Sequence, residues 1–186
     1  MTTVFIGGSR HVSRLFAEVR QRLDTIIEKT LPVLIGDANG ADKAVQQYLH
    51  GKHYANVIVF CAGSVCRNNV GNWKLQRVFP ETRDRNFNFY AAKDRLMSQQ
   101  ATVGLMIWDG KSVGTLLNVL RLLRKKKKAV VYHVPERRFW ELRKESEWVS
   151  FFSRCDAELR NRVEQKASLE ERSQQPTQTN LLTEPL

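Results

Sequence analysis

Glycines and small hydroxyl side chains recur where apolar, β-branched runs give way to helical patterns. Three turns have this composition: GGSR at residues 7–10, GDANGAD at residues 36–42 and DGKSVGT at residues 109–115. Glycine leaves backbone N–H groups unobstructed, and each helix start adds roughly half a positive charge. In a parallel sheet such turns meet at the carboxyl edge of the strands, where ligands bind. The three turns together predict an anion site that favours a nucleotide or another phosphorylated ligand.

The candidate ligand-binding residues lie in these turns or on the helical segment before the last one. They are Gly7, Gly8, Ser9, Arg10, Gly36, Asp37, Gly40, Asp42, Lys93, Gly110, Lys111, Ser112, Gly114 and Thr115. Gly114 and Thr115 are expected to contact a phosphate, although both residue types are also common where a helix begins. Arg10 offers a planar fork suited to bidentate phosphate contact, and Lys111 either reaches the phosphate or is a solvated loop residue.

The carboxylates near the turns have more than one interpretation. Asp37 and Asp42 are expected to make hydrogen bonds within their turn, and Asp42 alternatively accepts hydrogen bonds from ribose hydroxyls. Asp109 follows the fourth predicted strand and either caps the helix turn or acts in catalysis. Lys93 and Asp94 form a surface ion pair in the simplest interpretation.

Nothing in the sequence predicts a metal or a cofactor. The spacing of Cys61 and Cys66 lacks the second Cys or His pair of a zinc site. The four histidines are scattered, without a carboxylate or Cys at the spacing of a catalytic triad or a metal site. Trp73, in a segment rich in Gly and Asn, either stacks on a base or anchors that segment.

Charge and hydropathy limit the class of protein. The 186 residues are enough for one domain with its own core, and no stretch has the roughly 18 apolar residues of a membrane span. With no signal-peptide pattern, we expect a cytoplasmic protein. The formal net charge of +11 indicates anionic partners. Residues 111–144 hold eleven basic residues and two acidic ones, so most of this charge lies in one segment.

Five consecutive basic residues, RKKKK, run from Arg124 to Lys128. Such runs bind nucleic-acid backbones, but cations at a helix C-terminus also complement the helix dipole. The run falls at the end of a predicted helix, at the sheet pole opposite the glycine turns. We therefore interpret it first as a solvated helix end and second as a separate contact surface for nucleic acid.

Hydrophobic periodicity predicts alternating strands and helices. Strands are expected at residues 2–9, 31–36, 55–61, 102–108 and 129–134. Helices are expected at residues 12–28, 41–50, 89–99 and 112–127. This alternation is typical of an α/β fold, with a Rossmann-like parallel sheet of about five strands, helices on both faces and a C-terminal helical extension. Residues 62–86 are predicted to form a long ordered loop, and residues 137–152 a closing helix.

The chain is predicted to divide into three parts. Residues 1–152 form the Rossmann-like domain, and residues 153–173 form a helical arm that is either solvated or faces a partner. Residues 174–186 are polar and hold two prolines, which favours a disordered tail.

Four motifs resemble the SLOG superfamily of Rossmann-like nucleotide-binding proteins: GGSR, GDANGADKAV, KDRLM and WDGKSVGT. They occur in the expected order over residues 2–134. The superfamily includes Lonely-guy phosphoribohydrolases, DNA-processing proteins of natural transformation and sensor domains of antiviral systems, so the resemblance implies a nucleotide ligand and favours a homodimer. Neither GxGxxG after the first strand nor the spacing of a P-loop is present, which argues against a dehydrogenase or a kinase.

The phosphoribohydrolase motif is matched only in part. In those enzymes the last turn carries a Gly-Thr pair that holds the phosphate, followed by a Glu that acts at the ribose. Gly114 and Thr115 match the pair, but the resemblance places Leu117 at the Glu position, and Lys93 stands where the enzymes have an Arg. The resemblance therefore implies binding of a phosphorylated ligand without the family's mechanism of hydrolysis.

Three functions are compatible with these observations. The first is binding of a nucleotide or nucleotide-derived ligand, as in a sensor. The second is hydrolysis of an N-glycosidic bond in a nucleotide, with Asp42 or Asp109 in place of the missing Glu. The third is binding of single-stranded DNA, which the basic segment at residues 111–144 favours.

Overall fold

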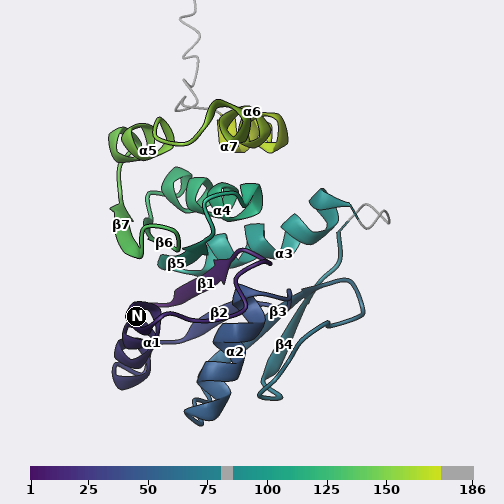
Figure 1. Ribbon diagram of the computed structural model, residues 1–186. Helices are drawn as coiled ribbons and strands as arrows, with labels where there is room; N and C mark the ends of the chain where they lie inside the picture. The colour runs from purple at the N-terminus through teal and green to yellow at the C-terminus, as the bar shows by residue number, and fades with distance from the viewer. Residues whose placement is uncertain (81–85, 173–186) are drawn as a thin grey trace, which may run out of the picture.

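The computed structural model describes residues 1–80 and 86–172, and its centre is one seven-stranded sheet. The strands are β1 (Val4–Gly8), β2 (Val33–Gly36), β3 (Val57–Ala62), β4 (Lys74–Val78), β5 (Val103–Trp108), β6 (Lys128–His133) and β7 (Arg138–Leu142). Their order across the sheet is β4-β3-β2-β1-β5-β6-β7 (Figure 1). All neighbours are parallel except β6 and β7. The sheet confirms the predicted Rossmann-like α/β class, with seven strands instead of about five.

Helices cover both faces of this sheet. They are α1 (Ala17–Glu28), α2 (Ala41–Gly51), α3 (Phe87–Gln100), α4 (Val113–Arg124), α5 (Glu145–Phe152), α6 (Ala157–Lys166) and α7 (Leu169–Arg172). The helices α1 and α2 pack on one face, and α3 and α4 pack on the other. The helices α5, α6 and α7 form an outer layer over α4 (Figure 1).

The first strand explains why the inner strands are apolar throughout. Val4 and Ile6 are buried in the core under α1 and α2, whereas Phe5 is buried in the core under α3 and α4. Successive side chains of a strand point to opposite faces. A strand that is covered on both faces therefore needs apolar residues at every position.

The prediction of a loop over residues 62–86 is wrong in part, because this segment contains β4. The strand pairs in parallel with β3 at the edge of the sheet. Its sequence, KLQRV, exposes Lys74 and Arg77. An edge strand has only one neighbour and is often charged, so β4 lacks the apolar pattern that identifies the inner strands.

The prediction of a closing helix over residues 137–152 is wrong in its first half. This part of the chain forms β7, which pairs antiparallel with β6, and α5 begins only at Glu145. A tight turn precedes β7, with Arg137 in the left-handed region at a φ of 51°. Phe139 and Trp140 pack against cores on opposite faces of the sheet, as neighbouring residues of a strand must.

The C-terminal arm is packed against the domain. Leu159 and Val163 of α6 are buried in the core that also contains α3 and α4. The arm is therefore not fully solvated, which corrects one of the two alternatives for it. The predicted tail at residues 174–186 lies outside the described residues, and the division of the chain into three parts stays a prediction.

The other predicted elements are present, and their bounds differ mostly by one to three residues. The larger difference is at α1, which begins at Ala17 instead of residue 12, because residues 9–16 lead out of the first glycine turn. No helix within residues 1–80 and 86–172 is long and apolar enough to cross a membrane.

Candidate functional site

Ser9 connects the three glycine turns. Its Oγ donates a hydrogen bond to Asp109 Oδ2 over 2.7 Å, which joins the first turn to the third. Its carbonyl oxygen accepts the Ala41 N–H over 3.0 Å, which joins the first turn to the second. Ser9 is fully buried between them. The three turns therefore meet at one edge of the sheet, as the parallel order of their strands requires.

Glycine permits the close approach of these turns at two positions. Gly40 has a φ of 78°, and a Cβ at this position would collide with the backbone of Arg10. A Cβ at Gly8 would collide with the carbonyl oxygen of Ile107 and with the side chain of Ala41. Any larger residue would push the first turn away from the second turn and from β5.

Asp109 organises the third turn. Its Oδ1 accepts the N–H groups of Lys111 and Ser112 over 3.0 and 2.8 Å, while its Oδ2 accepts the Ser9 hydroxyl. Burial acts to raise the pKa of Asp109, but these hydrogen bonds outweigh it and hold the pKa below its ordinary value. Both oxygens thus have partners within the protein, which favours the interpretation of Asp109 as a cap of the turn.

Part of the expected amide site is occupied by the protein itself. Besides the two amides bound by Asp109, the Thr115 N–H bonds to the hydroxyl of Ser112, the N-cap of α4. Among the described residues, no hydrogen-bond acceptor is found for the N–H groups of Val113 and Gly114. Since both residues line the cavity at the turns, these two amides and the dipole of α4 are available to an anion.

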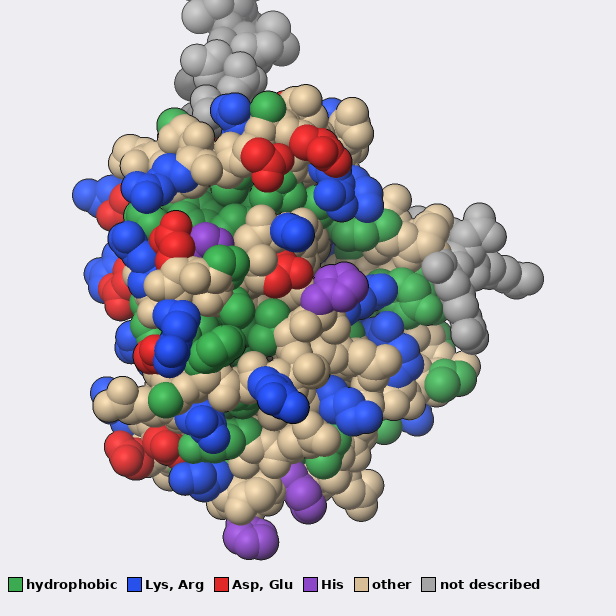
Figure 2. Space-filling model, viewed as in Figure 1, with side chains coloured by type: hydrophobic (Ala, Val, Ile, Leu, Met, Phe, Trp, Pro, Cys, Tyr) green, Lys and Arg blue, Asp and Glu red, His purple; other side chains and the backbone are tan. Residues whose placement is uncertain are grey.

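The turns open onto a cavity of about 870 Å³, which also contacts α3, α4 and α6. The charged residues in its lining are Arg10, Arg67, Lys93, Lys111, Arg162 and Lys166, together with Asp42, Asp94 and Asp109. Basic residues outnumber acidic ones, so the lining suits an anionic ligand. On the face shown in Figure 2, blue Lys and Arg side chains are spread over the whole face, and red Asp and Glu side chains lie mainly at the top and left.

Aromatic rings and cations lie together in this cavity. The guanidinium carbons of Arg67 and Arg10 lie 4.6 and 5.5 Å from the centre of the Tyr90 ring. Lys166 Nζ lies 4.9 Å from the centre of the Phe87 ring. All five residues line the cavity. Aromatic and guanidinium planes are stacking surfaces for nucleobases, so this wall combines stacking with positive charge.

A buried group of charges forms the floor next to Gly36. Lys93 is 4% exposed and donates a hydrogen bond to Asp94 Oδ1 over 2.7 Å, so the expected surface ion pair is in fact a partly buried one. Asp94 also accepts a hydrogen bond from Asn118 over 3.3 Å. A Cβ at Gly36 would collide with both the Asp42 carboxylate and the Lys93 ammonium, so glycine leaves room for these two groups.

Burial controls the protonation of Asp42. It raises the pKa of Asp42 to about 6, against the opposing effect of Lys93 and with a further rise from Asp94. Burial also acts against the charge of Lys93, but the carboxylates of Asp94 and Asp42 raise the pKa of Lys93 above its ordinary value. A carboxyl group with a pKa near 6 at a cavity wall can exchange a proton close to neutral pH.

The structure places most of the predicted ligand-binding residues at the cavity. Those in its lining are Gly7, Gly8, Ser9, Arg10, Asp42, Lys93, Lys111, Ser112, Gly114 and Thr115. Those outside the lining are Gly36, Asp37, Gly40 and Gly110. Leu117, at the position of the enzymes' Glu, is fully buried in the core, and Asn118 faces the cavity instead.

Asp37 has a structural partner. Its two oxygens accept hydrogen bonds from Arg67, from Nε over 3.1 Å and from Nη2 over 2.6 Å. Burial acts to raise the pKa of Asp37, but these bonds to Arg67 lower it below its ordinary value. The pair fastens the segment after β3 to the second turn and leaves the Arg67 guanidinium beside Tyr90.

Trp73 and the basic run, two further features singled out from the sequence, contact other parts of the protein. Trp73 donates its indole N–H to a backbone carbonyl over 2.9 Å and packs in the core under α2, which favours an anchor over a stacking platform. In the basic run, Arg124 pairs with Glu145 over 2.7 Å and Lys128 pairs with Glu141 over 2.6 Å. A nucleic-acid surface at this run stays a prediction. In the described part of the chain, no three His, Cys, Asp or Glu side chains are grouped to hold a metal ion.

Sequence analysis missed several residues of the lining, among them Arg67, Tyr90, Arg162 and Lys166. Arg67 lies in the segment taken as a loop, where no turn motif marks it. Arg162 and Lys166 lie on the arm, whose charges suggested a solvated helix. Their spacing of four residues, beside an apolar stripe on the same helix, was the available signal of a shared face.

Comparison with known proteins identifies one fold relative. No protein-family model and no curated protein matches the sequence. Among solved structures, the chain is similar to DNA processing protein A from Helicobacter pylori, in a structure that concerns its binding of single-stranded DNA. The TM-score is 0.53 at 15% sequence identity, over 88% of this chain and 79% of that chain. At this identity the likeness shows a shared fold.

Proposed function

We propose that the protein binds a nucleotide, or a nucleotide-derived phosphorylated molecule, in the cavity at the three turns. One observation carries the proposal: the hydrogen bonds of Ser9 bring three turns from distant parts of the chain to one cavity with an excess of basic residues. The cavity has the size of ordinary small-molecule sites. The fold likeness to a protein that binds single-stranded DNA supports a ligand built from nucleotides.

The phosphate is assigned to the beginning of α4. The N–H groups of Val113 and Gly114 lie there without an acceptor among the described residues, and Lys111 lines the same part of the cavity. An anion at a helix N-terminus accepts such amides and is stabilised by the helix dipole. The base is assigned to the wall of Tyr90, Arg10 and Arg67, because a planar ring can stack there on aromatic and guanidinium groups.

Calorimetric titration tests the proposal. The panel consists of nucleoside monophosphates of each base, cyclic nucleotides and dinucleotides derived from NAD. We expect at least one of them to bind with a Kd below about 1 mM. If no member binds below this range, the proposal is wrong.

A matched pair of glycine variants links binding to the cavity. A Cβ at Gly114 would meet only the Phe87 ring, at 3.9 Å, so Gly114→Asp is sterically permitted and places a carboxylate where the phosphate is assigned. An acidic residue in the first turn also suits the dipole of α4, so the fold is preserved. We expect at least about a tenfold loss of affinity, because the new charge repels the phosphate. Gly51→Asp is the control, since a Cβ at Gly51 has no neighbour within 4 Å and this residue does not line the cavity.

Single-stranded DNA is the second candidate ligand. The observations that favour it are the stacking of cations on aromatic rings in the cavity and the fold relative that binds such DNA. Affinity that depends on phosphate contacts falls steeply as the salt concentration rises. Fluorescence anisotropy with a labelled oligonucleotide at several salt concentrations tests this alternative, and binding that does not respond to salt would exclude it.

Hydrolysis of an N-glycosidic bond is the third candidate, and the raised pKa of Asp42 is what favours it. A carboxyl group with a pKa of about 6 is able to donate or accept a proton during bond cleavage. Asp109 is the weaker candidate, since both its oxygens accept hydrogen bonds within the turns. Incubation with nucleoside monophosphates, followed by chromatography of the free base, tests it. Release no greater than that of a protein-free control removes this candidate, and release that is unchanged in Asp42→Asn removes Asp42 as its acid or base.

A further inference from the structure

The helix α6 contributes two cations to a cavity that is otherwise built by the sheet and its turns. Arg162 and Lys166 line the cavity, although they follow the first turn by about 150 positions in the sequence. They are four residues apart and therefore lie on the same face of α6. The adjacent face of the helix is held against α4 by Leu159 and Val163, which are buried.

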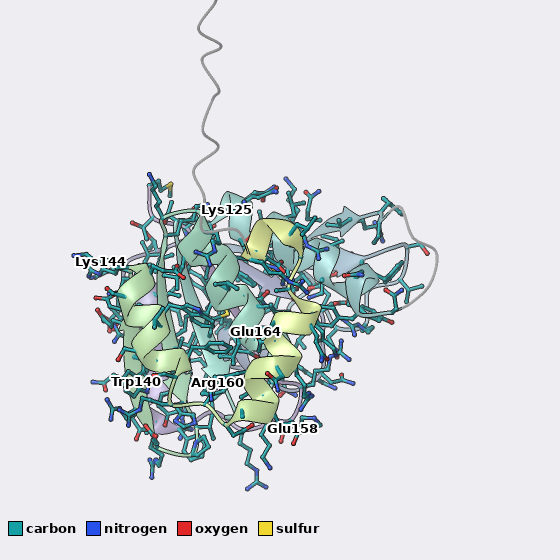
Figure 3. All side chains as sticks on the ribbon, turned by 90° about the horizontal axis from the view of Figure 1, so that it is seen from above. Lys125, Trp140, Lys144, Glu158, Arg160 and Glu164 are labelled. Carbon is teal, nitrogen blue, oxygen red and sulfur yellow. The ribbon has the colours of Figure 1, made fainter. Side chains whose placement is uncertain are left out.

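The two sides of α6 have different surroundings. Arg160 and Glu164 line a groove between α6 and α5, and Figure 3 labels both on α6 beside the neighbouring helix. Arg162 and Lys166 are absent from that groove and line the cavity at the turns instead. The packing of α6 on α4 thus fixes which of its charges reach the proposed ligand.

Lys166 lies close to the proposed phosphate position. Its Nζ is 4.9 Å from the centre of the Phe87 ring, and an edge atom of the same ring would be 3.9 Å from a Cβ at Gly114. The Phe87 ring thus contacts both the Lys166 ammonium and the position of Gly114, so the ammonium lies one aromatic ring away from the first turn of α4. A phosphate bound at Gly114 therefore has a further cation within reach of its next substituent.

Arg162 and Lys166 are not neutralised by the described protein. Neither makes an ion pair with any residue in the ranges 1–80 and 86–172. Lys111, in the turn before α4, is likewise without an ion pair in these ranges. By contrast, the three acidic residues in the lining are already paired or hydrogen-bonded at the turns and the floor. The charge that is available to a ligand is consequently positive, and Arg162 and Lys166 supply the part of it that comes from α6.

We propose that Arg162 and Lys166 bind a second phosphate group, so that the ligand of this cavity is a nucleotide with a diphosphate or longer phosphate chain. The inference rests on the proposed nucleotide site and names the class of nucleotide that the site selects. The first phosphate lies at the amides of Val113 and Gly114, and the second extends toward α6. Two cations without an ion-pair partner among the described residues match the additional negative charge of the second phosphate.

Calorimetry with a ligand series tests the selectivity. The series holds the base constant, using the base that binds best, and compares the nucleoside 5′-monophosphate, the 5′-diphosphate and a dinucleotide with a bridging diphosphate. For the wild-type protein we expect the diphosphate to bind at least about tenfold more tightly than the monophosphate, since each contact is charge-assisted. In Arg162→Ala/Lys166→Ala we expect the ratio of diphosphate affinity to monophosphate affinity to fall close to one. The affinity for the monophosphate should fall much less than the affinity for the diphosphate. The dinucleotide shows whether the second phosphate must be terminal.

The control variant also loses two positive charges, but on the other face of the sheet. Arg20→Ala/Lys29→Ala removes two exposed cations of α1 and its C-cap, neither of which lines the cavity. We expect the ratio of its affinities for the diphosphate and the monophosphate to equal that of the wild type. If the wild-type protein binds both nucleotides equally, or if the α6 variant keeps the wild-type ratio, the inference is wrong while the proposed nucleotide site stands. If no nucleotide binds the wild type, both are wrong.

Discussion

Ser9 is the residue that joins the three turns of the site, through its side chain and its backbone carbonyl. Its hydroxyl donates to Asp109 and accepts the His11 N–H over 3.1 Å, and its carbonyl accepts the Ala41 N–H. Ser9 itself is fully buried, while Asp109 is partly exposed and His11 is exposed. The Gly-Gly-Ser sequence therefore provides close approach through glycine and connection through serine.

Removal of this hydroxyl is expected to weaken both the fold and the site. Ser9→Ala leaves the His11 N–H and one Asp109 oxygen without their partner, which costs about 1–3 kcal/mol of the free energy of unfolding. Urea denaturation measures this loss. Ser150→Ala, at an exposed position of α5, is the control and should change stability by less than about 0.5 kcal/mol. A Ser9 variant as stable as this control would contradict the role assigned to the junction.

The raised pKa of Asp42 predicts how the free energy of unfolding depends on pH. Its pKa rises from 3.8 to about 6 in the folded protein, so the folded state holds the proton more tightly than the unfolded chain. The stability that Asp42 contributes is then fully present below about pH 4 and is lost as the pH rises through about 6. Relative to Asp42→Asn, which does not titrate, the wild-type protein should lose on the order of 2–3 kcal/mol between about pH 4 and pH 7. Urea denaturation of both proteins across this range measures the difference, and parallel pH profiles would contradict it.

At the scale of elements, a buried polar chain joins the cavity to the C-terminal helices. Asn118 of α4 donates to Asp94 in the cavity floor and accepts a hydrogen bond from Arg121 over 2.6 Å. Arg121 in turn donates to Glu171 of α7 over 2.6 Å. Arg121 and Glu171 are 3% and 4% exposed, so this is a buried ion pair between α4 and the end of the arm.

Loss of Glu171 is expected to be costly because it leaves a buried charge. Arg121 already has one nitrogen, Nη2, without a partner among the described residues. Glu171→Ala should therefore lower the free energy of unfolding by about 3–5 kcal/mol, as measured by urea denaturation. Glu164→Ala, an exposed position on α6, is the matched control. The double variant Arg121→Met/Glu171→Leu should recover most of the loss, and a single variant no less stable than the control would show that the pair contributes little.

The elements that sequence could predict are those whose environment is uniform along their length. The inner strands are apolar on both faces, α1 and α2 show one apolar stripe, and α4 is buried along almost its whole length, so their patterns follow directly from burial. The edge strands β4 and β7 have one neighbour each, and their mixed sequences resemble a loop and a helix. The turn residues of the site were predictable because their position follows from strand order. Arg162 and Lys166 were not, since only the packing of α6 on α4 brings them to the cavity.

At the scale of the whole molecule, positive charge is spread widely, and part of it is engaged in ion pairs away from the cavity. The net charge is +11, yet Arg124 and Lys128 of the basic run are paired with Glu145 and Glu141. Within the cavity lining, Lys111, Arg162 and Lys166 have no ion pair among the described residues. The whole-molecule charge therefore attracts polyanions generally, whereas the cavity presents a small number of cations in a confined space.

This distribution predicts how the protein distinguishes a nucleotide from a DNA strand. If the cavity is the binding site, an oligonucleotide contacts it through one end or one to three phosphates, and longer strands gain little. The logarithm of affinity should then fall with the logarithm of salt concentration with a slope of about −0.7 to −2, since single strands give about −0.7 per phosphate contact. Anisotropy with strands of increasing length measures both properties, and the best-binding mononucleotide should displace every strand. A slope much steeper than this, with affinity that keeps rising with length and resists displacement, would place DNA across the outer surface. There, Arg124 and Lys128 of the basic run would have to exchange their carboxylate partners for phosphates.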